Sequence, residues 1–256
     1  MKMCLFGAHS DQSRACLLLA VVVLAVLAIG AAPSAFAQQH ISKKYPTGKN
    51  VRLQLKNISG EIIVESWDRD EIKLSATMES PAARFSPRQT SDGLIVDVVG
   101  DNRGRPEVGN VNFKVQVPAS SSVDVETMRG DIHVFNIQGG AVRAKVSSEG
   151  DIQLSGISAS QVVASNTIGD IFFDGDLKRG GSYEFTSTKG NITLRIPGDS
   201  AFRLIAASPT RKIELGPFWN NRFQTFDGRK YVGDVGDGRA SVTVTNFHGS
   251  ISFMRR

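Results

Sequence analysis

The chain has 256 residues, of which 30 are basic and 25 acidic, and it contains two cysteines. A net charge of +5 over this length is mild, and no run of Lys or Arg indicates a groove for nucleic acid. Both cysteines, Cys4 and Cys16, lie near the N-terminus. The chain after residue 37 therefore has no disulfide and no thiol chemistry.

The first 37 residues differ in composition from the rest of the chain. Lys2 and Arg14 precede an apolar run over residues 16–32, and residues 35–37 have the small-x-small form of a signal peptidase site. This pattern predicts a signal peptide over residues 1–37, whose removal would leave no stable membrane span. The alternative is an uncleaved anchor, because the apolar run approaches the length that crosses a bilayer.

A polar tail and a set of short strands are predicted next. Residues 38–44 are polar and indicate a tail, and residues 45–118 are expected to form an N-terminal β cap and the first coils. The expected strands contain alternating apolar residues, a pattern that gives a strand one buried face. They lie at residues 51–55, 62–64, 72–76 and 94–98.

An eight-residue phrase recurs along most of the chain, first at residues 57–64. It consists of Asn, Ser or Thr, two variable residues, Gly, a polar residue, Ile, any residue and a large apolar residue. In a copy at residues 208–215, Arg211 occupies the glycine position. The glycines at positions 130, 150, 169 and 190 lie 20, 19 and 21 residues apart, a period typical of stacked repeats. The glycines of the phrase are Gly60, Gly130, Gly150, Gly169, Gly190 and Gly249.

Each repeat is expected to contain two strands and two corners. Gly supplies positive φ at a sharp corner, and a small polar residue before it can bond nearby backbone groups. A second alternating stretch follows about ten residues later, as in residues 142–146 or 202–206. Because the glycine phrase precedes only alternate strands, we predict an all-β fold, a β-solenoid with coils of about 20 residues, in preference to an antiparallel meander. A right-handed coil follows from the general crossover preference.

The solenoid is expected over residues 119–256, with an aromatic-rich insertion at residues 217–239. Aromatic side chains lie among basic ones in this insertion, a mixture that suits stacking on sugars or docking on a partner. The alternative is structural, since aromatic side chains can also close the end of a solenoid core. The candidate binding residues are Phe218, Trp219, Arg222, Phe226, Arg229, Lys230 and Tyr231.

Acidic residues follow the repeat glycines and would stack in neighbouring coils. Asp131, Asp151 and Asp170 would then lie at about the 4.8 Å strand spacing, and must be solvated, bonded to backbone or bridged by a cation. Exposed corner residues are favoured, with no metal and no cofactor. Glycosidase chemistry needs two carboxyls about 5–9.5 Å apart, a spacing that Asp131 with Asp151, or Asp174 with Asp176, could provide.

Residues 117–125, the coil that follows them and the closing segment 238–253 resemble the bacterial putative-adhesin family of unknown function. The resemblance covers roughly residues 48–254 and rests on repeated short phrases. It implies an exported, all-β protein with β-helix-like repeats and no defined catalytic residue. The chain departs from the pattern at Arg211 and at the aromatic-rich segment.

Together these features predict a secreted, non-catalytic binding or structural module of the cell envelope, in the periplasm or the extracellular space. Its partner would be an envelope polysaccharide or a protein, and the exposed coil end suggests a homo-oligomer. The alternative is a carbohydrate-active β-helix enzyme, a polysaccharide hydrolase or lyase that acts through stacked carboxylates.

Overall fold

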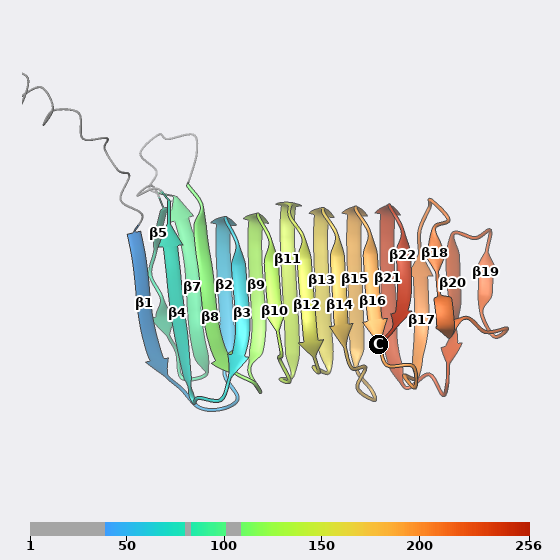
Figure 1. Ribbon diagram of the computed structural model, residues 1–256, viewed down its shortest axis with the longest axis horizontal. Helices are drawn as coiled ribbons and strands as arrows, with labels where there is room; N and C mark the ends of the chain where they lie inside the picture. Colours follow the sequence, from blue (N-terminus) through green and yellow to red (C-terminus); the bar gives the residue numbers. More distant parts are fainter. Residues whose placement is uncertain (1–38, 80–82, 101–108) are drawn as a thin grey trace, which may run out of the picture. The chain divides into compact units, whose positions relative to one another are not determined.

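The computed structural model describes residues 39–79, 83–100 and 109–256, which belong to a unit that begins at residue 38. Two β-sheets face each other across a shared core (Figure 1). The predicted signal peptide, residues 1–37, lies outside the described residues, so it stays a prediction.

The first sheet has ten strands, and most of its neighbouring strands are parallel. Antiparallel pairs occur only at its N-terminal end among the described strands. Its strands, in spatial order, are β1 (Gln39–Pro46), β4 (Glu71–Met78), β8 (Val111–Pro118), β3 (Ile62–Trp67), β10 (Ile132–Phe135), β12 (Ile152–Ile157), β14 (Ile171–Gly175), β16 (Ile192–Ile196), β22 (Ile251–Arg255) and β18 (Ile213–Glu214).

The second sheet has twelve strands, of which eleven form one path, and β6 (Arg88–Gln89) pairs with β7 (Gly93–Gly100) outside that path. Its strands, in spatial order, are β19 (Gln224–Phe226), β20 (Lys230–Val235), β17 (Phe202–Ala207), β21 (Ala240–His248), β15 (Ser182–Lys189), β13 (Gln161–Ile168), β11 (Ala141–Glu149), β9 (Ser122–Arg129), β2 (Arg52–Ser59), β7 (Gly93–Gly100) and β5 (Ala83–Phe85).

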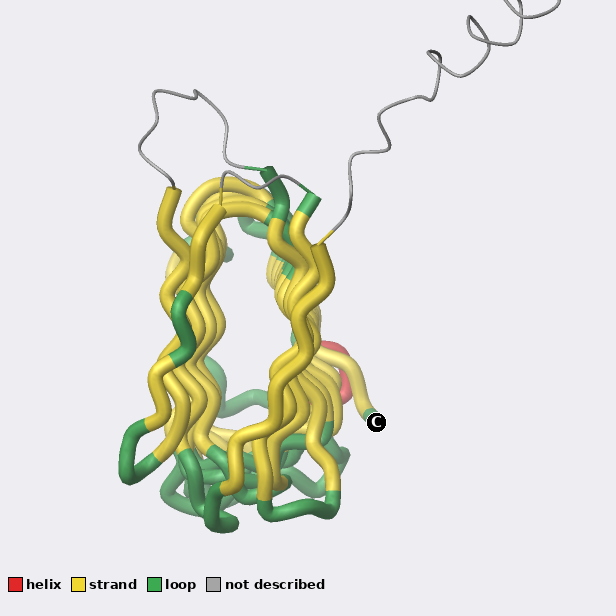
Figure 2. Tube along the Cα trace, turned by 90° about the vertical axis from the view of Figure 1, so that its left-hand side faces the viewer, coloured by secondary structure: helices red, strands yellow, loops and turns green. Residues whose placement is uncertain are grey.

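Each glycine corner joins a strand of the second sheet to a strand of the first. The pairs β9–β10, β11–β12, β13–β14 and β15–β16 stack in chain order, and Ile132 lies in register between Ile62 and Ile152. Figure 2, which looks along the stack, shows the two sheets as opposite walls joined by turns. The predicted β-solenoid is confirmed.

The order of the coils in space differs from their order in the chain. The last coil, β21–β22, lies between β15–β16 and β17–β18. At the other end, β2–β3 lies between β7–β8 and β9–β10. The coil nearest each end of the stack is therefore neither the first nor the last in the chain. It is β7–β8 at one end and β17–β18 at the other.

The N-terminal region combines coils with an antiparallel edge. Gly60 N donates a hydrogen bond to Arg129 O at 3.0 Å, so the first glycine phrase is a true coil stacked on the second. Its distance of 70 residues from Gly130 reflects the intervening excursion through β4–β8, which occupies the far side of the β2–β3 coil. The antiparallel pairs of this region, as the structure describes it, are β1–β4, β4–β8, β5–β7 and β6–β7.

Residues 38–44 were expected to form a polar tail, and this expectation was wrong from residue 39 onward. They belong to β1, which pairs antiparallel with β4 along its whole length, because Ile41 and Tyr45 can pack against the core. Lys43, Lys44 and Pro46 lie on this outermost strand, and such residues disfavour pairing with a further strand. Self-association through this end of the stack therefore stays a prediction, and the composition of the edge strand disfavours it.

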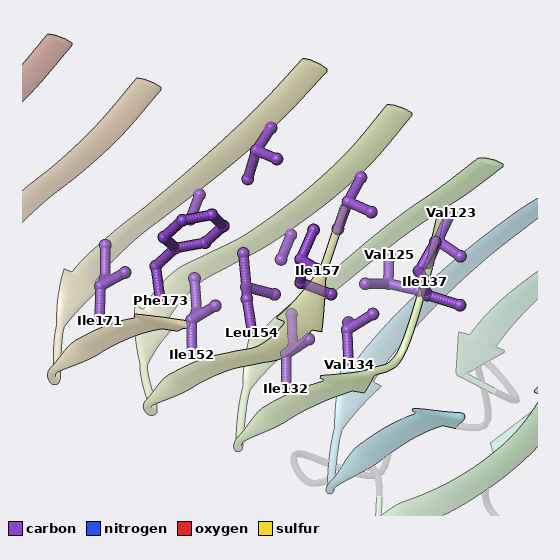
Figure 3. Close-up of a cluster of buried hydrophobic side chains, with 14 of the residues drawn as sticks. Val123, Val125, Ile132, Val134, Ile137, Ile152, Leu154, Ile157, Ile171 and Phe173 are labelled. Carbon is purple, nitrogen blue, oxygen red and sulfur yellow. The ribbon is translucent and has the colours of Figure 1, made fainter. Parts of the chain in front are cut away.

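The core consists of the inward-facing residues of every coil, and equivalent positions form columns along the stack. Figure 3 shows Ile132, Ile152 and Ile171 side by side on successive strands. Larger side chains fill the C-terminal half, where the rings of Phe173 and Phe185 lie 5.1 Å apart. Alternation in the sequence thus produces one continuous apolar interior.

The repeat glycines also form a column, and the backbone passes close to each of them. A Cβ atom on Gly169 would lie 2.2 Å from the carbonyl oxygen of Gly150. Buried asparagines beside the column donate to its carbonyls: Asn246 Nδ2 to Gly190 O at 2.8 Å, and Asn166 Nδ2 to Gly150 O at 3.4 Å. The phrase therefore specifies both the close approach of coils and the partners of the corner backbone.

Tyr183 places a hydroxyl group at the turn between β14 and β15. The hydroxyl oxygen accepts a hydrogen bond from Lys178 N at 2.6 Å, and the hydroxyl donates to Ala159 O at 2.9 Å. Burial raises the pKa of Tyr183 above its ordinary value near 10. The neutral hydroxyl is thus the form that the fold stabilises.

We expect Tyr183→Phe to lower the free energy of unfolding by about 1–3 kcal/mol, because two backbone groups lose their partner. The raised pKa adds a pH dependence: the unfolded tyrosine ionises first, so this stabilisation is present below about pH 10 and falls as the pH rises toward the folded pKa. Urea unfolding at pH 8 and above pH 10 measures both effects. A stability difference between wild type and variant that does not shrink at the higher pH would contradict the second.

Candidate binding site

The aromatic-rich segment closes the C-terminal end of the solenoid. After β18 the chain enters a short 3-10 helix, η1 (Gly216–Phe218), in which Pro217 occupies an early position that needs no backbone N–H. The chain then forms β19 and β20, an antiparallel hairpin added to β17. Because the second sheet continues into this hairpin while the first stops at β18, the inner face of the hairpin extends beyond the first sheet.

Two of the aromatic residues close the core. Phe218 and Phe223 are buried, and the ring of Phe218 lies 5.7 Å from that of Phe202 and 6.4 Å from that of Phe253. These contacts extend the apolar interior to the end of the stack. Phe218 was predicted as a binding residue, but it has a structural role. This agrees with the alternative interpretation, in which aromatic side chains close the end of the core.

Two other aromatic residues form the wall of an open pocket. Trp219 is 55% exposed; its ring stacks on Phe223 at 5.8 Å and meets the ring of Tyr231 at 5.9 Å with an angle of 80° between the planes. The pocket has a volume of about 480 Å³. Its lining residues are Ile213, Glu214, Leu215, Gly216, Trp219 and Tyr231.

Phe226 and Lys230 lie on the opposite face of the hairpin from Tyr231. They are register partners, whereas Tyr231 pairs with Thr225, and adjacent residues in a strand point to opposite faces. Phe226 is 53% exposed, and the Lys230 ammonium lies 6.0 Å from the centre of its ring. The structure therefore brings only Trp219 and Tyr231 of the predicted residues into the pocket.

The two predicted arginines are directed elsewhere. Arg222 lies within 3.5 Å of Gly236 O through Nη1, and Arg229 Nε lies 3.7 Å from Asp227 Oδ2. Asp227 also pairs with Arg211 at 2.7 Å. Arg211 stands at the corner where the other coils have glycine. Its φ of +62° is positive, as theirs is, but the glycines of the repeat corners have φ values between +109° and +152°.

The carboxylates at the glycine corners bond to the backbone of the neighbouring coil. Asp131 Oδ1 accepts a hydrogen bond from Asp151 N at 2.8 Å, and Asp151 Oδ1 accepts one from Asp170 N at 2.7 Å. Asp170 Oδ1 continues the series by accepting from Asn191 N at 2.7 Å. These carboxylates act as acceptors in a structural ladder, which removes the main support for using them in glycoside cleavage.

Asp151→Ala is expected to lower the free energy of unfolding by about 1 kcal/mol, since one inter-coil acceptor is lost. Asp151→Asn keeps an acceptor oxygen and removes one of the stacked charges, so its stability is expected to match or exceed that of the wild type. Urea unfolding of both variants measures the difference. A loss in the asparagine variant as large as in the alanine variant would show that the negative charge itself is required.

Asp174 and Asp176, the second candidate pair, are held by arginines. Asp174 is buried and its Oδ2 lies 2.6 Å from Arg195 Nη2, while Asp176 pairs with Arg256. Arg256 Nη1 also lies 3.6 Å from Asp174 Oδ1. This cluster joins β14 and the loop after it to β16 and to the residue that follows β22, which is a structural role.

Within the described residues, no group of three or more His, Cys, Asp or Glu side chains is arranged to hold a metal ion. A second apolar pocket of about 690 Å³ lies at the N-terminal end, between β1 and the β5–β7 edge. Its apolar lining comes from Ile41, Met78, Ala83, Phe85 and Val99. Sequence analysis missed this pocket because its apolar residues come from four separate strands.

The stacked two-strand coils and the aromatic end define a two-walled β-solenoid with a pocket at its C-terminal end. In the described ranges, no helix has the length and apolar character needed to span a membrane. The chain belongs to the Toastrack DUF4097 family, whose model matches residues 25–253. The family resemblance noted in the sequence is thereby confirmed.

Solved structures of similar fold carry names that refer to adhesion or lipid binding. A putative cell adhesion protein from Clostridium sporogenes is 11% identical, with a TM-score of 0.53 and coverage of 86% of this chain and 100% of that chain. A putative adhesin from Bacteroides fragilis is 10% identical (TM-score 0.34; 86% and 99% covered), and a putative lipid binding protein from Parabacteroides distasonis is 11% identical (TM-score 0.33; 85% and 97% covered). At such identities the first structure supports the shared fold alone. A comparison with curated proteins gave no match.

Proposed function

We propose that this protein is an exported, non-catalytic binding module of the cell envelope, and that its ligand binds at the Trp219–Tyr231 pocket. The signal-peptide pattern of residues 1–37 supports export, to the periplasm or the cell surface. The names of the related structures support a role in adhesion. An envelope polysaccharide or a protein partner is the expected class of ligand.

One observation carries the choice of site: Trp219 is 55% exposed although its ring contacts two other aromatic rings, those of Phe223 and Tyr231. A large apolar ring left in water is unfavourable for the free protein, and rigid aromatic side chains are frequent hot spots of binding surfaces. The hairpin β19–β20 supplies the rigid support. Binding would therefore require little reorganisation of the pocket.

An array of envelope glycans, peptidoglycan fragments and envelope protein extracts would test the proposal. We expect binding by the wild type, and a loss of at least about tenfold in affinity for Trp219→Ala, the size of a typical hot-spot effect. Phe226→Ala is the matched control, because Phe226 is 53% exposed on the other face of the hairpin. Equal loss in both variants, or no loss in either, would overturn the choice of site.

The same samples would be analysed for cleaved glycans. The proposed binding module leaves every glycan intact. Cleavage that disappears in Asp131→Asn or Asp174→Asn would instead support the carbohydrate-active enzyme predicted as the alternative.

A further inference from the structure

The geometry points to the trimethylammonium of a choline-type group on an envelope polymer as the ligand of the Trp219–Tyr231 pocket. This inference rests on the proposed function, because it names the chemistry recognised by the same pocket. A choline-type group presents a cation on an alkyl stem.

The aromatic walls suit a cation. The rings of Trp219 and Tyr231 meet nearly at right angles, and Phe223 stacks on one face of the indole. A cation in the corner between the rings can approach the remaining indole face. Attraction between a cation and an aromatic face operates within about 6 Å and is strongest for tryptophan.

The charge of the lining also selects a cation. Glu214 is exposed at the rim, and apart from the Tyr231 phenol it is the one ionisable side chain among the described lining residues. In the part of the chain that the structure describes, no ion pair includes Glu214. An anionic ligand would meet this carboxylate as a like charge, whereas an ammonium group would neutralise it.

The floor of the pocket suits methyl or methylene groups. Ile213 and Leu215 lie on the core side of the pocket, and Leu215 is buried. Apolar groups around the positive nitrogen would cover this surface while the charge faces the rings and Glu214. A volume of about 480 Å³ leaves room for such a group and for part of the molecule that bears it.

Basic residues of the segment do not cancel this preference. Arg211 and Arg229 both lie beside Asp227, at 2.7 and 3.7 Å. Lys230 lies over Phe226, on the opposite face of the hairpin from Tyr231. None of these cations is among the residues that line the pocket.

Titration of the purified protein with four small molecules would test the inference: choline, phosphocholine, an Nα-acetyl-lysine methylamide and 3,3-dimethyl-1-butanol, the neutral isostere of choline. Calorimetry and tryptophan fluorescence give the affinities. We expect choline to bind at least about tenfold more tightly than the neutral isostere. Tighter binding of the lysine amide than of choline and phosphocholine would overturn the choice of a choline-type group.

Variants locate the effect. Glu214→Gln keeps the size of the side chain and should weaken cation binding about five- to tenfold, with little effect on the neutral isostere. Trp219→Ala should abolish both the binding and the fluorescence response. Phe226→Ala and Glu184→Gln, which alter exposed residues outside the pocket, should bind as the wild type does, and circular dichroism would show that each variant is folded.

Equal affinity for choline and its neutral isostere, or no binding of any ammonium compound, would overturn the inference. The proposed function would still stand if the glycan and protein array showed binding that depends on Trp219. Both would fail if no ligand of either experiment depended on Trp219.

Discussion

Replacing Gly169 with alanine is expected to destabilise the protein by about 3–5 kcal/mol, the combined cost of overpacking and of a strained backbone. The added Cβ would lie 2.2 Å from Gly150 O and 2.6 Å from its carbonyl carbon, which are backbone atoms of a neighbouring coil. The φ of +132° is itself unfavourable for a residue with a side chain. Thermal and urea unfolding would measure the loss.

Two other glycines separate the causes of this loss. Gly180 has a φ of +74° but nothing within 4 Å of an added Cβ, so Gly180→Ala should show the backbone cost alone, about 1 kcal/mol. Gly140 has only the Ser122 hydroxyl oxygen, at 3.6 Å, so Gly140→Ala should be close to neutral. If Gly169→Ala cost no more than Gly180→Ala, the close stacking of coils at the glycine column would be refuted.

Deletion of residues 240–256 is expected to prevent folding altogether, although it removes only the final segment of the chain. These residues form β21 and β22, which pair with β15 and β17 in one sheet and with β16 and β18 in the other. Their loss would remove the buried Val242, Val244, Ile251 and Phe253 and leave unpaired edges in both sheets. Long unpaired edges promote aggregation, so we expect insoluble protein.

A chain that begins at residue 47 is the matched control for this deletion. It lacks β1, a strand of eight residues that pairs only with β4 among the described strands. We expect this shorter chain to remain soluble, with a reduced melting temperature. Equal solubility of the two truncated proteins, measured by sedimentation and circular dichroism, would contradict the position of the last coil between two others.

Sequence analysis predicted the coil well because its determinants are local. The glycine corner, the preceding small polar residue and the alternation after it lie within eight residues, and the structure assigns a contact to each. The order of coils could not be predicted. Inward-facing residues such as Val125 and Val244 have the same chemistry in every coil, so the pattern does not specify which coils are neighbours.

The candidate site could be predicted in part. The density of aromatic side chains drew attention to residues 217–239, yet the chain there changes direction through η1 and a hairpin, and no simple period governs which rings are buried. Glu214 and its neighbours were overlooked because they follow the irregular Arg211 corner. The copy of the phrase at residues 208–215 nevertheless predicted a strand at its end, and this strand is β18, which contains Glu214.

The return of the last coil into the stack also constrains the order of folding. Before β21 and β22 dock, β15 and β16 have a stacked partner on one side only, and β17 with its hairpin lacks its place in the stack. A folding chain in this state presents open strand edges, the kind of surface that holding chaperones shield.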